Sequence, residues 1–354
     1  MNELLSKLGM EQPIIQAPMS GTSTPALAAA VSNAGGLGSL GLASLGADGA
    51  HKAIAQTQAQ TNRAFNVNLF CHQTAEADIG GDARWIETLR PEFKKFGADP
   101  PNELKDIYKS FLIDDAMLDM LLATRPKVIS FHFGLPQQEK IDALKRAGSV
   151  LIATATSLDE AEAAQSARMD AVVAQGFEAG GHRGIFDPSG SDDQLSMMVL
   201  TELLAAKLSI PVIAAGGIMN GAGIAAALNL GAVAAQLGTA FVGCPESSAD
   251  AGYRAALASS AAWHTMMTTA ISGRPARCLA NKFSRMPASE IAAYPRAYDI
   301  GKALNAAAKA KGEFGYGAQW AGQGAPLARA LPAAELMAAL ISELKLHWEE
   351  SHEI

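Results

Sequence analysis

The chain has 354 residues, a formal net charge of -7 and three cysteines, so it is long enough for one α/β barrel with an added lobe and too long for a small stapled scaffold. The acidic balance, without a cluster of lysines and arginines, argues against a nucleic-acid partner and leaves a small molecule as the expected ligand. Cys71, Cys244 and Cys278 form no CxxC pair and residues 1–12 lack the layout of a signal peptide, so we expect a cytoplasmic protein.

Short apolar runs that end in glycine or polar residues recur along the chain, as expected of buried parallel strands. Eight such runs occur, at residues 14–19, 36–41, 65–70, 128–134, 150–156, 171–176, 211–217 and 232–239. Helical patterns lie between most of them, at residues 24–33, 136–147, 157–168, 194–207 and 220–230, with Pro25 suited to a first turn and a capping box at Ser157 and Glu160. This alternation predicts an α/β fold, a (β/α)8 TIM barrel, with a doubly wound open sheet as the alternative.

Residues 208–245 carry no charge, and their length alone would suit a membrane span. Glycine pairs and asparagines interrupt them, at Gly216-Gly217, Asn220-Gly221 and Asn229. We interpret this stretch as a strand, a glycine turn, an alanine-rich helix and a second strand, and we expect no membrane segment.

Two segments do not fit the simple repeat. Residues 71–125 are too long for one helix and contain three prolines, so we expect several helices over one rim of the barrel. Residues 246–331, with helices predicted at 249–269 and 295–311, would form a mostly helical lobe over the C-terminal face, and a last helix at 332–347 would return to the barrel. The expected domains are therefore 1–245, 246–331 and 332–354.

The period of two along a strand predicts which side chains point into the barrel. Asn66 and Asn68 share an inner row, as do Ser130 and His132, whereas Phe65, Val67, Leu69, Ile129, Phe131 and Phe133 belong to outer rows. Polar side chains inside a barrel need partners, and near the C-terminal strand ends a ligand can supply them. Structural water or a backbone carbonyl is the alternative.

Polar groups after the later strands suggest a nucleotide. Gln175 and Gln236 hold corresponding places on two strands, and their amides suit a heterocycle with alternating donors and acceptors. Glycine turns at 215–218 and 236–239 match the phosphate site common in such barrels, with Thr239 adding a hydroxyl, unless the glycines only permit tight turns. Residues 35–38 supply no GxGxxG turn and no metal motif is present, so FMN is the expected cofactor, with no bound metal.

The loop at 175–184 sets His182 among four glycines after an apolar run. Such a loop brings bare backbone and an imidazole to one ligand, although taken alone it also fits a flexible turn with a surface histidine.

Several motifs together resemble nitronate monooxygenase, formerly called 2-nitropropane dioxygenase, in its class I bacterial group. They are QAPMSG at 16–21, AGGLG at 34–38, NVN at 66–68, FHFG at 131–134, QGFEAGGHRG at 175–184, AAGGI at 214–218, QLGT at 236–239 and YGAQWAGQ at 316–323. The resemblance implies that FMN is bound by Met19, Asn68, Gln175, Gly180, Gly217, Gln236, Leu237, Gly238 and Thr239, and that His182 is catalytic.

The class I pocket also has a second histidine, tyrosines and a lysine. The matching candidates for substrate binding are His132, Tyr108, Tyr294, Tyr298 and Lys302. Tyr298 and Lys302 are four residues apart, so one helical face can present both to the barrel mouth, although an exposed aromatic and a solvated lysine are the alternative.

The reaction that the resemblance implies is the oxidative denitrification of an alkyl nitronate to a carbonyl compound and nitrite, by one-electron oxidation on FMN and reaction with oxygen. His182 would balance the anion when protonated, or take the α-proton of a neutral nitroalkane. Lys302 and His132 would attract a substrate carboxylate, which favours propionate 3-nitronate.

Other functions fit parts of the same pattern. One is a related FMN barrel that uses NAD(P)H as a quinone or enoyl-thioester reductase, one is a non-redox phosphate-binding isomerase, and one is a non-catalytic flavin-binding protein. The sequence leaves open whether the chain forms a homo-oligomer.

Overall fold

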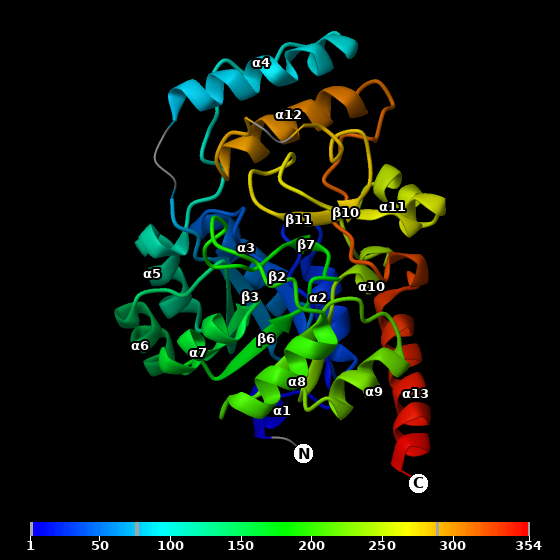
Figure 1. Cartoon of the computed structure of the whole chain (residues 1–354). Coiled ribbons are helices and arrows are strands. Elements are labelled where there is room, and N and C mark those ends of the chain that lie inside the picture. The colour runs from blue at the N-terminus through cyan, green and yellow to red at the C-terminus, as the bar shows by residue number, and fades with distance from the viewer. Residues whose placement is uncertain (1–2, 75–77, 288–289, 353–354) are drawn as a thin grey trace.

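The computed structural model describes residues 3–74, 78–287 and 290–352 and shows eight parallel strands that form a barrel (Figure 1). The strands are β1 (Ile14–Gln16), β2 (Gly38–Gly41), β3 (Phe65–Phe70), β4 (Val128–His132), β5 (Val150–Ala155), β6 (Ala171–Gln175), β8 (Val212–Ala215) and β9 (Ala234–Leu237). They pair in the order β1-β9-β8-β6-β5-β4-β3-β2, and a bridge from Ile15 to Leu37 joins the two ends. The predicted barrel is therefore confirmed, and the open sheet is wrong.

Helices cover the outside of the barrel, as the strand–helix alternation predicts. They are α2 (Pro25–Asn33), α3 (Ala47–Gln58), α5 (Asp115–Thr124), α6 (Gln138–Arg146), α7 (Leu158–Ser166), α8 (Met197–Lys207), α9 (Gly221–Asn229) and α13 (Ala333–His352). The side chains of Thr24, Ser157 and Asn220 cap α2, α7 and α9 by accepting a first-turn N–H. Within the described residues, every helix is too short or too polar to span a bilayer.

The inner and outer rows of the strands build two separate apolar layers. Outward side chains such as Val67, Ile129 and Phe131 pack under α3, α5, α6, α7 and α8. Inward side chains such as Ile152 and Val173 fill the lower half of the barrel, where α1 (Glu3–Leu8) closes the N-terminal end. The upper half of the interior is left to the polar members of the same rows, so the site forms at the C-terminal strand ends.

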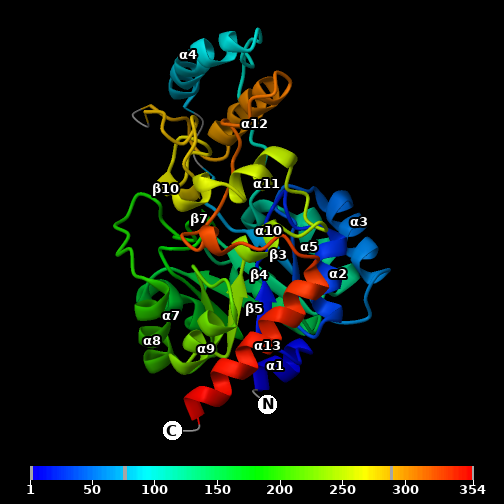
Figure 2. The same cartoon turned by 90° about the vertical axis from the view of Figure 1, so that its right-hand side faces the viewer.

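A lobe stands over the C-terminal end of the barrel (Figures 1 and 2). Its top is a pair of packed helices, α4 (Ile79–Lys95) and α12 (Arg296–Lys309), held together by a cluster that includes Trp85, Phe93, Ile300 and Leu304. Beneath them lie α11 (Ala251–Leu257), the short turns η2 (Ser260–Trp263) and η3 (Ala325–Leu327), and α10 (Thr239–Val242) after β9. Because α4 comes from an early part of the chain, the lobe is not one continuous segment. The domain boundaries at 245 and 331 stay a prediction.

An antiparallel sheet in the lobe was not predicted. It pairs β10 (Thr265–Thr268) with β11 (Ala276–Leu279), and β11 with β7 (Gly181–His182) from the loop after β6. The helix expected at 249–269 is therefore wrong in its second half, where Thr265–Thr268 alternate along a strand. The segment 71–125 also divides differently, because α4 joins the lobe, whereas η1 (Phe111–Ile113) and α5 lie in the barrel's outer layer.

Two local predictions need correction. Phe133 does not continue the outer row, because β4 ends at His132 and Phe133 has a left-handed φ of 71°, which turns its ring to the side of the site. Ser157 caps α7, but Glu160 does not complete a capping box. Its carboxylate instead accepts hydrogen bonds from Thr156 at 2.6 Å and from the backbone N–H of Phe186 at 2.6 Å, which ties α7 to the loop after His182.

Candidate active site

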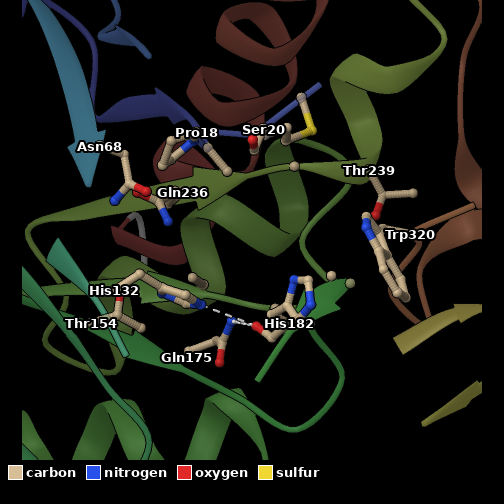
Figure 3. A pocket seen from close by; sticks show the side chains of 18 of the residues that line it. Pro18, Ser20, Asn68, His132, Thr154, Gln175, His182, Gln236, Thr239 and Trp320 are labelled. Carbon is tan, nitrogen blue, oxygen red and sulfur yellow. Dashed lines mark hydrogen bonds between the residues drawn. The ribbon is translucent and has the colours of Figure 1, made fainter. Parts of the chain in front are cut away.

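One cavity lies where the barrel strands end and the lobe begins, and it holds about 1250 Å³ of empty space, counting the part that is open to solvent. Figure 3 shows that side chains from opposite walls of the barrel point into it. All but three of the predicted site residues line it: Met19, Asn68, Tyr108, His132, Gln175, Gly180, His182, Gly217, Gln236, Gly238, Thr239 and Tyr298.

The three exceptions differ in how far they lie from the cavity. The side chain of Leu237 packs outward against the barrel helices, because it follows the inward Gln236 on the same strand. Tyr294 is buried behind the site, with its ring 5.6 Å from that of His182. The exposed Lys302 holds its ammonium 4.7 Å from the ring centre of Tyr108 and 5.0 Å from that of Tyr298, two tyrosines that line the cavity.

The backbone of His182 is fixed from both sides. Its strand β7 pairs with β11, with Ala276 opposite His182. Its carbonyl oxygen accepts hydrogen bonds from Gln175 Nε2 at 3.0 Å and His132 Nε2 at 3.2 Å (Figure 3). The Gln175 Oε1 atom accepts a further bond from the N–H of Gly184 at 2.7 Å. Two inward side chains of the barrel therefore hold the loop that carries His182.

The imidazole of His182 has a defined partner in the lobe. Its Nε2 atom lies 2.9 Å from the hydroxyl oxygen of the fully buried Ser272, and that hydroxyl donates to the carbonyl of Arg274 at 3.2 Å. With the hydroxyl proton on that carbonyl, we assign Nε2–H of His182 as the donor to the Ser272 oxygen. Nδ1 is then the nitrogen of His182 that is able to accept a proton.

Burial keeps the site histidines neutral. Desolvation, with the charges of His132 and Arg274 adding to it, lowers the pKa of His182 to about 3. Burial likewise lowers the pKa of His132 to about 4 and that of His72, which lies behind the site, to about 4. At neutral pH these imidazoles are therefore uncharged.

The predicted polar row inside the barrel forms its own network. The amide nitrogens of Asn66 and Asn68 each donate to the hydroxyl of Ser130 at 2.9 Å, and Asn68 also donates to the Ser130 carbonyl at 3.2 Å. These inward polar side chains thus find some of their hydrogen-bond partners within the protein. By contrast, the described residues offer no hydrogen-bond partner to the side-chain amide of Gln236, which points into the cavity (Figure 3).

Glycines follow the strand beside Gln236, since β8 pairs Ala215 with Gln236 and continues into Gly216 and Gly217. Gly216 and Gly217 have φ values of 126° and 70°, which L side chains rarely adopt. A Cβ atom on Gly180 would lie 2.4 Å from the backbone nitrogen of Gly322, so a larger residue there would push two segments apart. The N–H of Gly322 donates to the Thr239 hydroxyl at 3.0 Å, which joins the turn after β9 to the lobe.

Aromatic side chains of the lobe form the opposite wall. The rings of Tyr108 and Trp320 lie 5.7 Å and 6.1 Å from that of Tyr298, and burial raises the pKa of Tyr298 to about 12. The Trp320 ring lies 5.1 Å from that of His182. Among the described residues that line the cavity, none is an aspartate or a glutamate. The lining is thus uncharged at neutral pH, and it places no negative charge against an anionic ligand.

Sequence reasoning missed several residues of this site. Tyr253, Thr154 and Trp320 line the cavity, and Ser272 contacts His182 from 90 positions along the chain. Trp320 lies within the motif at 316–323, so a signal for it was present. A serine preceding a glycine turn carries no comparable signal.

Comparisons with known proteins agree over the whole chain. A family model described as "Nitronate monooxygenase" matches residues 2–343. A nitronate monooxygenase of Paraburkholderia phytofirmans is 60% identical over 351 residues, which cover 98% of this chain and 96% of the relative. Another, of Pseudomonas aeruginosa, is 52% identical over 342 residues, which cover 96% of this chain and 97% of the relative. The crystal structure of a nitroalkane oxidase from Streptomyces ansochromogenes matches with a TM-score of 0.91 and 39% identity over 98% of this chain and 99% of that one.

Proposed function

The chain belongs to the nitronate monooxygenase family, and on that premise we propose that it carries out FMN-dependent oxidative denitrification of alkyl nitronates. The reaction would consume oxygen and give a carbonyl compound and nitrite. The observation that carries the proposal is the cavity itself, in which a fixed, neutral histidine faces a space without carboxylates. Such a space sets no carboxylate against a small anion, and the ammonium of Lys302 lies over two of its tyrosines.

The residues present fit FMN. Gln236 offers a free amide, and Asn68 keeps its oxygen for a heterocycle, while Gln175 retains one of its two amide hydrogens. The open backbone at Gly217, with Gly180, Gly238 and the hydroxyl of Thr239 in the same cavity, suits a phosphate. We assign FMN binding to these residues together with Met19. When bound, FMN supplies the electron transfer that the side chains themselves lack.

The structure changes the role proposed for His182. Because its pKa is lowered to about 3, a protonated His182 is not available at neutral pH to balance a nitronate. The neutral ring offers Nδ1 as the acceptor for the α-proton of a nitroalkane, while Ser272 holds Nε2–H. Gln175 and His132 fix the position of the loop from behind. We therefore assign His182 to proton acceptance and orientation of the substrate.

Lys302 and the tyrosines are proposed to set which nitronate is bound. The ammonium over Tyr108 and Tyr298 lies at the rim, where the far end of a substrate would reach. A carboxylate at that end would pair with Lys302, and propionate 3-nitronate has this carboxylate. Tyr294 supports the ring of His182 from the buried side.

Replacing His182 by asparagine tests the proposal. His182→Asn should lower turnover on the order of 100-fold, the usual scale for a positioned acid–base group. It should leave flavin bound, because most of the proposed phosphate contacts, at Gly217, Gly238 and Thr239, follow other strands. The measurements are visible absorbance and nitrite release from propionate 3-nitronate, which tests orientation of the substrate, and from nitroethane, which still carries the α-proton. Retained turnover in a flavin-loaded variant would assign the chemistry to another residue.

A further inference from the structure

Arg274 is a buried cation with few partners. Its side chain is 4% exposed, and it donates one hydrogen bond to the carbonyl of Ile185 at 2.5 Å. Its Nε atom has no partner among the described residues. Two other buried arginines differ, because Arg183 and Arg296 bond carboxylates at 2.8 Å and 3.0 Å. The carboxylates of Glu160 and Asp187 act on this charge from beyond ion-pair distance. The charge is therefore only partly offset, and burying such a charge is costly.

An aromatic ring separates this guanidinium from His182. Arg274 lies 4.2 Å from the ring centre of Phe133, and the Phe133 ring meets that of His182 edge-on at 5.5 Å. A tight turn at Gly273, with a φ of 86°, places Ser272 on the His182 imidazole and Arg274 behind Phe133. One short segment thus delivers both the hydrogen-bond partner of the histidine and a positive charge.

The groups around His182 show what that charge does. His132 on β4, His72 after β3, and Tyr294 and Tyr298 beside it are neutral at pH 7, because burial lowers the pKa of each of the two histidines and raises the pKa of each of the two tyrosines. Arg274 keeps its charge, since burial lowers its pKa only to about 10. Among the charged groups that lower the pKa of His182, Arg274 is the one that stays positive at neutral pH.

We propose that Arg274 supplies the fixed positive charge that favours an anionic nitronate beside the neutral His182. This inference rests on the proposed function and deepens it. Arg274 does not reach the cavity, so it acts through the field it creates across Phe133 rather than by contact with the substrate. Lys302 remains the residue proposed to bind a second, remote negative charge on the substrate.

Three flavin-loaded variants test the proposal. Arg274→Met removes the charge and keeps most of the stem, and Arg274→Lys keeps a charge. Arg277→Met is the matched control, because Arg277 is also 4% exposed and packs on an aromatic ring, that of Phe177, at 4.9 Å, but is not among the groups that act on His182. For each variant, KM is measured for ethylnitronate, an anion without a carboxylate, and for neutral nitroethane. If nitroethane is not turned over, its inhibition constant replaces KM.

If Arg274 acts through its charge, removing that charge should weaken the binding of the anion more than the binding of the neutral compound. Arg274→Met should raise the constant for ethylnitronate about 10-fold and change that for nitroethane less than about 2-fold, with Arg274→Lys restoring most of the loss. Arg277→Met should leave the ratio of the two constants unchanged. An equal change for both compounds in Arg274→Met would overturn the proposal, since lost packing alone acts in that way.

A second measurement does not depend on turnover. Histidine NMR, with the His182 signal identified by its loss in His182→Asn, is followed down to the lowest pH at which the protein stays folded. In Arg274→Met the His182 signal should begin to shift about one pH unit higher than in the wild-type protein. An unmoved titration would overturn the proposal. If the wild-type protein does not turn over ethylnitronate, the proposed function fails, and this titration still decides the role of Arg274.

Discussion

Acidification from pH 7.5 to 5.5 should destabilise the protein because the buried histidines resist protonation. Folding lowers the pKa of His72 to about 4, that of His132 to about 4 and that of His182 to about 3, from an ordinary value of 6.5. Below pH 6.5 the unfolded chain takes up protons that the folded protein does not bind. Stability contributed in this way is present above pH 6.5 and is lost as the pH falls toward 4.

The size of the destabilisation follows from the difference between the folded and unfolded pKa values of the histidines. At pH 5.5, one unit below the unfolded pKa, each such histidine favours the unfolded chain by about 1.4 kcal/mol, so three give about 4 kcal/mol. That sum is an upper figure, because His132 and His182 are partly exposed to the cavity, whereas His72 is only 1% exposed. The perturbed carboxylates of the protein have their ordinary pKa below this window and contribute little to it.

Urea unfolding at pH 7.5 and 5.5, at fixed protein and flavin concentrations, measures the change. His72→Gln should lose about 1.4 kcal/mol less than the wild-type protein between the two pH values, whatever its stability at pH 7.5. His264→Gln, which alters a side chain exposed in the folded protein, should match the wild-type loss. Equal losses in His72→Gln and wild-type protein, or a wild-type loss below about 1 kcal/mol, would refute the reasoning.

Two further predictions concern the ligands. Lys302→Met should reduce kcat/KM for propionate 3-nitronate more than for ethylnitronate, by about 1.5–3 kcal/mol for a lost charge-assisted hydrogen bond, and equal losses in steady-state assays at one pH would remove Lys302 from carboxylate recognition. Acid denaturation should release one FMN per chain, because Gly217 and Thr239 border a cavity suited to a mononucleotide, and chromatography that recovers FAD or no flavin would contradict the assignment.

The sequence predicted the barrel because its strands are short apolar runs that end in glycine. Runs such as 211–217 were predicted too long, since β8 ends at Ala215 and the glycines that follow form the turn. The inward row of Asn68, Ser130 and His132 followed from the period of two and lines the cavity. Local patterns were sufficient wherever one strand or helix decided the outcome.

Long-range pairings account for what the sequence did not reveal. The partner of His182 is Ser272, brought there by the pairing of β7 with β11, and no local pattern encodes a contact across 90 residues. The sequence around Arg274 carries no signal of burial, and the fold places this side chain behind Phe133. Glu160 matched a helix cap, but the N–H of Phe186, a loop residue, competes for its carboxylate. In each case tertiary structure replaced the local partner.

Anaerobic mixing tests the central claim most directly. Flavin-loaded protein is combined with propionate 3-nitronate in one experiment and with NADH in another, and the visible spectrum is followed before air is admitted. Our account predicts that the nitronate changes the flavin spectrum, that admitted oxygen restores it with release of nitrite, and that NADH has no comparable effect. Rapid bleaching by NADH, with no response to the nitronate, would contradict the account and indicate a reductase.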